Sequence, residues 1–262
     1  MPERLKGKKI LVTRPEEQAQ NLCRLIENEG GVAIRLPVID IQPVEVDSGL
    51  REYLSRISSY DIGIFVSQNA VKWTLDLLGK DFHVLNELKI VAIGKSTARL
   101  LQEEGINDIG YTEGIASSET LLELPVFSNP SIKGSRVIIF RGVGGREYLA
   151  DRLTEKGAYV DYAEVYRRQP SRHGEARLEK IFIDESPDFI VVTSTEGLQN
   201  LFDMLSSKQR NILLNTQLLV LGDRMAKHAL KLGFSKKPII ADETTDRGLL
   251  RTIIQGNGES DK

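Results

Sequence analysis

Six short segments of the sequence combine hydroxyls, glycines and arginines in a way that suits anion binding. Each follows a short apolar run and precedes residues with helical spacing. Unpaired backbone N–H groups at a helix start, with the positive end of the helix dipole, favour carboxylate or phosphate groups. We therefore expect these segments to form a substrate-binding site for an anion. Their candidate residues are Arg14, Ser67, Asn69, Gly94, Ser96, Thr97, Arg141, Gly144, Gly145, Arg146, Thr193, Ser194, Thr195 and Gly222.

The glycine-rich segment from Arg141 to Arg146 allows three interpretations. It can hold a carboxylate at a helix start, hold the phosphates of a nucleotide, or form a plain tight turn. Its sequence, Arg-Gly-Val-Gly-Gly-Arg, lacks the Gly-x-Gly-x-x-Gly spacing of dinucleotide-binding loops, which favours carboxylate binding. Arg14 either contacts the same ligand or bridges to a nearby carboxylate. The hydroxyl residues of the other segments can act as helix N-caps and nothing more.

The elements that position these segments are short strands that alternate with helices. The run from Ile10 to Thr13 precedes apolar residues at helical spacing, with Pro15 suited to the first turn and Gly30 to the end of the helix. The same order returns at Asp61 to Val66 and at Ile90 to Ile93. This alternation predicts an α/β fold with doubly wound parallel sheets, whose ligands bind beyond the carboxyl ends of the strands.

The chain also contains an internal repeat. Residues 8–43, KKILVTRPEEQAQNLCRLIENEGGVAIRLPVIDIQP, align with residues 135–170, SRVIIFRGVGGREYLADRLTEKGAYVDYAEVYRRQP. Arg14 and Arg141 are 127 positions apart, and so are Ser67 and Ser194. The repeat predicts two similar α/β domains.

Composition limits the possible classes of function. The 262 residues suffice for two modest domains, and a formal net charge of −2 leaves no broad basic face for nucleic acid or an anionic membrane. The N-terminal apolar run is too short for a signal peptide, so we expect a cytoplasmic protein. The single cysteine, Cys23, and Trp73 lie on apolar helical stripes and are expected in the core. The 3 histidines lack metal-ligand spacing, so no metal site is expected.

Several motifs are similar, in the same order along the chain, to those of the uroporphyrinogen III synthase family. They are ILVTRPEEQA, FVSQNAV, AIGKSTARLL, FRGVGGREYLADRLTEKGAYV running into VYRR, and VVTSTEGLQNL. Each motif alone is a common strand-to-helix junction, whereas the ordered set within a duplicated chain is specific. The sequence departs from the family after Gly222, where Asp223, Arg224 and Met225 stand in place of hydroxyl residues.

The resemblance implies that the two domains are interleaved in the sequence. One domain would comprise residues 1–39 and 168–262, and the other residues 40–167, joined by a two-stranded linker. The pairs Gln42-Pro43 and Gln169-Pro170 would mark that linker, because proline follows extended chain.

The resemblance also implies a reaction. The substrate would be hydroxymethylbilane, a linear tetrapyrrole with an acetate and a propionate on every ring. Its hydroxyl leaves, and a spiro intermediate forms and reopens so that the terminal ring is inverted in the macrocycle. Tyr166, in the VYRR motif, matches a tyrosine placed near the leaving hydroxyl, where it could donate a proton; its alternative role is a packed strand aromatic. The reaction needs no cofactor and depends on orientation of the substrate. A monomer in transient contact with hydroxymethylbilane synthase is expected.

Two other functions fit a pair of α/β domains. A glycosyltransferase-like enzyme would require a sugar-nucleotide site, and no ribose-binding acid stands out in the sequence. A non-catalytic anionic-ligand-binding protein of the periplasmic type would require export, and the sequence lacks a signal peptide.

Overall fold

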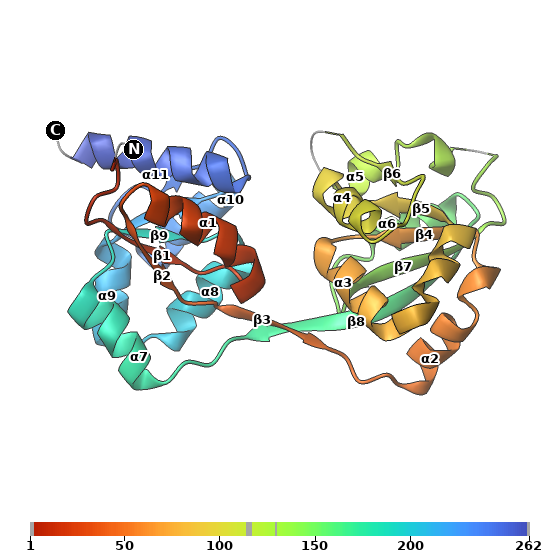
Figure 1. Cartoon of the computed structure of the whole chain (residues 1–262), viewed down its shortest axis with the longest axis horizontal. Coiled ribbons are helices and arrows are strands. Elements are labelled where there is room, and N and C mark those ends of the chain that lie inside the picture. The colour runs from red at the N-terminus through yellow and green to blue at the C-terminus, as the bar shows by residue number, and fades with distance from the viewer. Residues whose placement is uncertain (1–2, 114–116, 129, 261–262) are drawn as a thin grey trace. The chain divides into compact units, whose positions relative to one another are not determined.

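The computed structural model describes residues 3–113, 117–128 and 130–260. The chain divides into two compact units, one formed by Met1–Asp40 with Gln169–Lys262 and the other by Ile41–Arg168. Both boundaries lie one residue after the positions expected from the sequence. Figure 1 shows the red N-terminal elements and the blue C-terminal elements together in the first unit.

The first unit contains a parallel five-stranded sheet in the order β11-β10-β9-β1-β2. Its strands are β1 (Lys9–Val12), β2 (Val32–Arg35), β9 (Phe189–Val191), β10 (Gln217–Val220) and β11 (Ile239–Ile240). Its helices are α1 (Glu16–Asn28), α7 (Glu175–Glu179), a π-helix (Lys180–Glu185), α8 (Thr195–Met204), α9 (Ser207–Asn215), α10 (Asp223–Leu232) and α11 (Asp246–Ser260).

Helices α1 and α11 cover one face of this sheet. Their apolar residues pack with alternate strand residues such as Ile10 and Val12, as expected when successive side chains of a strand point to opposite faces. Cys23 of α1 is completely buried in this core, and burial raises the pKa of its thiol. The prediction that Cys23 is a core residue is therefore confirmed.

The second unit contains a six-stranded sheet in the order β3-β8-β7-β4-β5-β6. Its strands are β3 (Ile39–Pro43), β4 (Ile62–Phe65), β5 (Lys89–Ala92), β6 (Gly110–Tyr111), β7 (Arg136–Gly142) and β8 (Tyr159–Pro170). Its α-helices are α2 (Ser48–Ser55), α3 (Gln68–Leu78), α4 (Lys95–Glu103), α5 (Ser118–Leu121) and α6 (Tyr148–Glu155), with 3-10 helices at Ile57–Ser59, Gly79–Glu87 and Pro125–Phe127.

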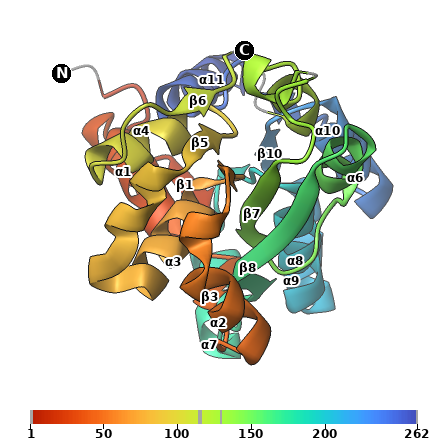
Figure 2. The same ribbon diagram turned by 90° about the vertical axis from the view of Figure 1, so that its right-hand side faces the viewer.

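Both faces of this second sheet are covered. Ile138 and Phe140 of β7 pack with residues of α3 and α4, while Val137 and Ile139 pack with residues of α5 and α6. Figure 2 shows α3 and α4 on one side of the sheet and α6 on the other. The predicted doubly wound parallel architecture is thus confirmed for this unit.

The strand orders of the two sheets correspond through the sequence repeat. The order β2-β1-β9-β10-β11 in the first unit matches the order β8-β7-β4-β5-β6 in the second. Each unit therefore combines two strands from one half of the chain with three from the other half. Strands β3 and β8, which end in the two Gln-Pro pairs, are neighbours and carry the chain across the unit boundary.

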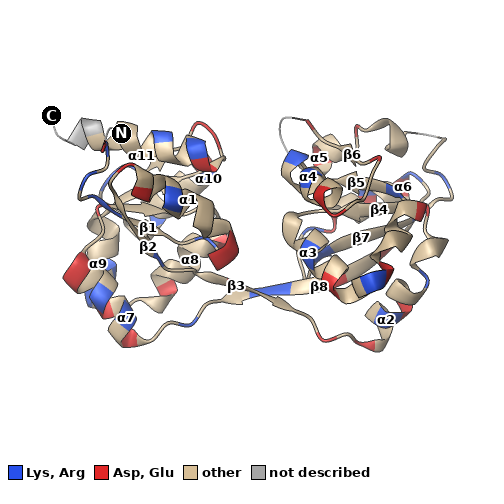
Figure 3. Cartoon of the chain, in the orientation of Figure 1, with Lys and Arg blue, Asp and Glu red and all other residues tan. Residues whose placement is uncertain are grey.

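Charges of both signs are interspersed over each unit, as Figure 3 shows. This pattern agrees with the small net charge of −2. Among the described residues, no helix is both long enough and apolar enough to span a membrane.

Tyr60 offers a test of the packing in the second unit. Its side chain is buried, and its hydroxyl donates to Asp161 at 2.6 Å. Burial, followed by the nearby Asp161 carboxylate, raises the pKa of Tyr60 to about 12. The folded state holds the phenol proton of Tyr60 more tightly than the unfolded state does. The protonated phenol therefore stabilises the fold fully below pH 10, and this stabilisation is lost as the pH rises toward 12.

We expect the free energy of unfolding to fall by about 1 kcal/mol between about pH 9 and about pH 11 through Tyr60 alone. The Tyr60→Phe variant should be less stable at neutral pH but should lose this part of the alkaline dependence. Urea unfolding at several pH values measures both effects. An unchanged alkaline slope in the variant would contradict the assignment.

Candidate functional site

The loops that follow β4, β5 and β7 meet at the carboxyl edge of the second sheet. Ser67 ends the loop after β4 and caps α3, its Oγ accepting from Ala70 N at 3.2 Å. Gly94 begins α4 with φ of 85°, and its N–H donates to Thr112 Oγ1 at 3.0 Å. The Gln68 side chain joins the two loops by donating to the Ser96 carbonyl at 3.2 Å. These contacts hold the two helix starts side by side.

A β-bulge places Tyr166 at this edge. Arg141 of β7 pairs with Glu164 of β8, whereas the next residue, Gly142, pairs with Tyr166, so Val165 is the extra residue. Bulges commonly redirect a side chain near functional sites. Gly142 then provides the space for the ring, because a Cβ at this position would lie 2.6 Å from Tyr166 Cε2.

The bulge brings together two residues that are 99 positions apart in the sequence. Tyr166 Oη lies 3.2 Å from Ser67 Oγ, and either atom can be the donor. The Tyr166 side chain is 4% exposed and belongs to the core cluster on the α3 side of the sheet. Its ring is therefore held firmly, with the hydroxyl directed to the start of α3.

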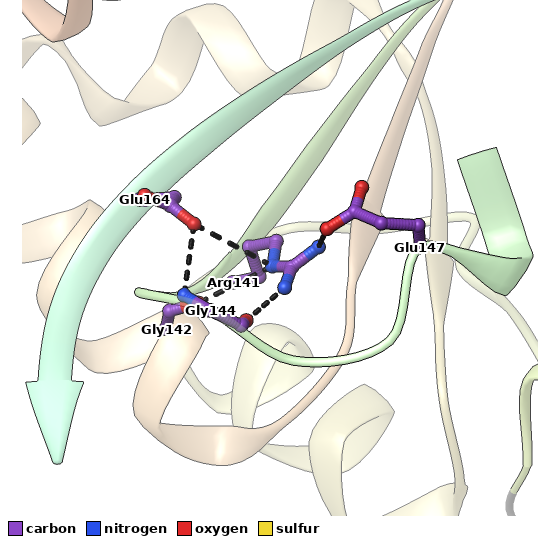
Figure 4. Close-up of polar contacts among 5 residues, drawn as sticks. All are labelled: Arg141, Gly142, Gly144, Glu147 and Glu164. Carbon is purple, nitrogen blue, oxygen red and sulfur yellow. Dashed lines mark hydrogen bonds and ion pairs between the residues drawn. The ribbon is translucent and has the colours of Figure 1, made fainter.

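In the glycine-rich loop after β7, the side chain of Arg141 bonds to other groups of the protein. Figure 4 shows the guanidinium of Arg141 among partners from its own loop and from β8. Nη2 donates to the Gly144 carbonyl, Nε donates to the Gly142 carbonyl at 3.2 Å, and Nη1 lies 3.4 Å from Glu147. The Gly144 N–H donates to Glu164 at 3.0 Å.

Arg141 is 5% exposed, and its guanidinium also lies over the Tyr162 ring, 4.5 Å from the ring centre. All three guanidinium nitrogens have partners within the protein, so the structure places Arg141 as a support of the loop. The two glycines are required by the backbone: Gly144 has φ of 73° and Gly145 has φ of 107°. A Cβ on Gly145 would also lie 2.9 Å from Arg141 Nη2.

The other two candidate arginines have carboxylate partners. Arg14 forms an ion pair with Asp246 at 2.5 Å, and Asn21 donates to the same carboxylate. Of the two roles considered for Arg14, the bridge to a nearby carboxylate is present in the structure, and the contact with a ligand stays a prediction. Arg146 pairs with Glu119 at 2.8 Å, with 68% of its side chain exposed, so it can exchange this partner for a ligand at small cost.

The remaining candidates of the second unit differ in exposure. Ser96 is exposed, Asn69 is partly buried, and Thr97 is buried within α4. Asn69 and Ser96 lie in the first turns of α3 and α4, as expected, whereas burial gives Thr97 a packing role.

The first unit has a similar edge beyond β9 and β10. Ser194 caps α8, its Oγ accepting from Gly197 N at 2.9 Å. Thr193 and Thr195 flank this cap and are partly buried. Gly222 precedes α10 in an extended conformation with φ of 171°. Thus all these candidates lie at the carboxyl ends of parallel strands, where doubly wound proteins bind ligands.

Within the described residues, no group of three or more His, Cys, Asp or Glu side chains is arranged to hold a metal ion. Trp73, which was also assigned to the core from the sequence, is partly buried and packs against the margin of the cluster that contains Tyr166.

Sequence reasoning missed Gly142 and Glu164. Gly142 could have been suspected because it precedes the flexible Gly144-Gly145 pair at the end of a strand, but its contact with Tyr166 depends on the bulge. The sequence gives no sign that Glu164 will bind the loop backbone, because the two segments are separated by α6.

Comparison with known proteins identifies relatives over nearly the whole chain. Residues 20–251 match the family model described as uroporphyrinogen-III synthase HemD. The chain is 33% identical over 246 residues to the uroporphyrinogen-III synthase of Escherichia coli K12, covering 93% of this chain and 99% of that protein. It is also 33% identical over 248 residues to the enzyme of the same name from Salmonella typhimurium, with the same coverage.

Solved structures with the same fold come from two other bacteria. A mutant uroporphyrinogen III synthase from Thermus thermophilus superposes with a TM-score of 0.63 at 21% identity, covering 97% of this chain and 100% of that one. The uroporphyrinogen-III synthetase of Helicobacter pylori 26695 gives 0.64 at 15% identity, covering 95% and 99%. These likenesses establish the fold, and the family-model match and the 33% identity to curated relatives establish that the chain belongs to the uroporphyrinogen-III synthase family.

Proposed function

We propose that this protein closes hydroxymethylbilane to uroporphyrinogen III, with inversion of the terminal pyrrole ring and loss of water through a spiro intermediate. Membership of the family supports the reaction. The single structural observation that carries the residue assignment is the 3.2 Å contact between Tyr166 Oη and Ser67 Oγ at the carboxyl edge of the second sheet.

In this proposal Tyr166 is the catalytic residue. Its hydroxyl donates a proton to the leaving hydroxyl of the bilane, and Ser67 Oγ–H donates to the phenol oxygen as negative charge develops there. The leaving group departs as water. The terminal pyrrole loses a proton when it closes the ring, so protons balance over the whole reaction.

Backbone N–H groups and exposed side chains at the helix starts hold the substrate carboxylates. The groups assigned to this role in the second unit are Asn69, Ser96 and Arg146, while Gly94 shapes the turn that begins α4. In the first unit they are Thr193, Ser194, Thr195 and Gly222. Arg141, Gly144 and Gly145 act as positioning residues, because their polar groups shape the loop between β7 and α6.

We further propose that the protein acts as a cytoplasmic monomer and receives its labile substrate in transient contact with hydroxymethylbilane synthase. Free hydroxymethylbilane closes spontaneously without inversion, so catalysis here consists mainly of folding the substrate into one conformation. The roles of Tyr166 and Ser67 do not depend on the oligomeric state or on this contact.

The test is a coupled assay in which hydroxymethylbilane is supplied and the type I and type III isomers are separated by chromatography. We expect the purified protein to form the type III isomer predominantly, without added metal or cofactor. The Tyr166→Phe variant should be slower by about 10- to 100-fold while keeping the fold, because only the hydroxyl is removed. Ser67→Ala should show a smaller loss.

Accumulation of type I isomer alone, at the spontaneous rate, would disprove the proposed function. If the parent forms type III but Tyr166→Phe has the same kcat, the function would stand and the proton-donor assignment would be wrong. A thermal melt of each variant separates a catalytic loss from a loss of folded protein.

A further inference from the structure

A cavity of about 490 Å³ lies beside α10 in the first unit. Its lining comes from one turn at the start of α8 and one face of α10. The lining residues are Thr195, Arg224, Lys227, His228 and Lys231. None of these described lining residues is a carboxylate, so the chemistry of the cavity is strongly cationic.

The basic residues form a continuous stripe on α10. Positions 224, 227, 228 and 231 follow the helical spacing of i, i+3, i+4 and i+7, which places them on one face. The opposite face of the helix is buried through Met225, Ala226 and Ala229. We call the four residues Arg224, Lys227, His228 and Lys231 the basic stripe.

The basic stripe places like charges side by side, although Asp223 lies four residues before Lys227 and Lys231 lies in the last turn, where the helix dipole favours a cation. Like charges three or four residues apart destabilise a helix by about 0.2–0.5 kcal/mol per pair. Arg224 also lies in the first turn of α10, where the helix dipole disfavours positive charge. Among the described residues, Arg224, Lys227 and Lys231 have no carboxylate within ion-pair distance. A bound anion would compensate for these repulsions.

His228 is fixed in orientation by its neighbours. Its Nε2 lies 3.1 Å from Gln199 Oε1, and Gln199 Nε2 donates to Asp203 at 3.0 Å. The amide oxygen of Gln199 can only accept, so Nε2 of His228 carries the proton. One wall of the cavity is therefore ordered, whereas Arg224, Lys227 and Lys231 are exposed.

The cavity lies where a ligand of this fold is expected. Helix α8 follows β9 and α10 follows β10, so both lining elements start from the carboxyl ends of parallel strands. The cap of α8 at Ser194 is in the adjacent turn. The same cavity thus offers a hydroxyl from Thr195 and three cationic side chains.

We infer that the basic stripe binds carboxylate groups of the tetrapyrrole, and that it determines how tightly this chain holds substrate and product. The inference rests on the proposed function for the identity of the ligand. It assigns the role to Arg224, Lys227 and Lys231 of α10. The stripe binds acetate and propionate side chains and takes no part in the bond-forming steps.

The experiment compares two triple variants with the parent. The test variant carries Arg224→Gln, Lys227→Gln and Lys231→Gln. The control carries Lys208→Gln, Lys236→Gln and Lys237→Gln, which removes three exposed charges from the same unit away from the cavity. Both variants change the net charge equally, so a long-range effect of charge would appear in both.

Two measurements are made on each protein. The first is the Kd for uroporphyrin III, the stable oxidised form of the product with the same acetate and propionate groups, at low and high salt. The second is the KM and kcat for hydroxymethylbilane. We expect the test variant to raise both Kd and KM by about 10-fold at low salt, with kcat unchanged and a weaker salt dependence. The control should resemble the parent.

The outcomes separate this inference from the proposed function. If the parent forms the type III isomer but the test variant binds uroporphyrin III as tightly as the control, the stripe is a solvated helix face and the inference is wrong. Equal weakening in both variants would also overturn it. If the parent forms only type I, the function fails, and the uroporphyrin III titration alone then decides whether the stripe binds carboxylates.

Discussion

Replacing Gly142 by alanine is expected to lower the rate of type III isomer formation by about 100-fold, the upper end of the loss expected on removal of the Tyr166 hydroxyl. The added methyl group would lie 2.6 Å from Cε2 and 2.7 Å from Cζ of Tyr166, which is closer than atoms can pack. The backbone of Gly142 does not have positive φ, so the effect is purely steric. The ring must move, and its contact with Ser67 moves with it.

The displaced ring also disturbs the core, since Tyr166 belongs to the cluster between the sheet and α3. We expect a loss of about 1–3 kcal/mol in the free energy of unfolding, as for other overpacked sites. The measurement is the isomer assay together with a thermal melt, on protein shown to be folded.

A double variant tests the mechanism of this loss. In a Tyr166→Leu background the bulky ring is absent, so adding Gly142→Ala should cost little further stability or activity. If the two losses simply add, the alanine acts through the backbone of the loop and not through the tyrosine ring.

The sequence predicted the architecture well because local patterns of apolar residues indicate the strands and helices of this fold. The alternation of apolar strands and helical stripes indicated parallel sheets, and the repeat indicated two similar units. Strands β1 and β7 lie where the repeat places them, at Lys9–Val12 and Arg136–Gly142. The interleaving could not be derived from these patterns, since it depends on which half of the chain each strand pairs with.

The sequence predicted which candidate residues lie at helix starts, but not the contacts that they make. Ser67 and Ser194 lie at helix starts, as their types and spacing indicated. Arg141 was predicted to bind an anion, and this stays a prediction; the structure shows its guanidinium bonded to carbonyls and carboxylates of its own unit. A composition pattern identifies a donor, but it does not show which acceptor is nearest in the folded chain.

Two features escaped sequence analysis for a common physical reason. The contact between Gly142 and Tyr166 arises from a shift of strand register, which has no local sequence signature. The basic stripe on α10 does have a signature, the helical spacing of Arg224, Lys227 and Lys231, but its meaning depends on the cavity, whose described lining residues include no carboxylate. Both depend on contacts between distant segments.

Replacing Phe140 by alanine is expected to cause the largest loss of stability, about 3–5 kcal/mol. Phe140 is completely buried in β7, and its ring stacks on Phe65 with centroids 4.5 Å apart and planes inclined by 14°. Truncation removes this stacking and leaves a cavity beneath α3. The Phe140→Leu variant keeps most of the volume and should lose less.

Because the protein has a single tryptophan, the loss of stability can be measured in the second unit alone. Trp73 lies on α3 and packs against the same core cluster as Phe140, so its fluorescence reports unfolding of the second unit. Phe182→Ala is the matched control, because Phe182 is equally buried but belongs to the first unit. In urea we expect Phe140→Ala to lower the Trp73 midpoint, whereas Phe182→Ala should lower the far-ultraviolet circular dichroism midpoint and leave the Trp73 midpoint nearly unchanged. Equal shifts of Trp73 fluorescence in both variants would mean that the units unfold together, and the interleaved chain would then behave as one cooperative structure.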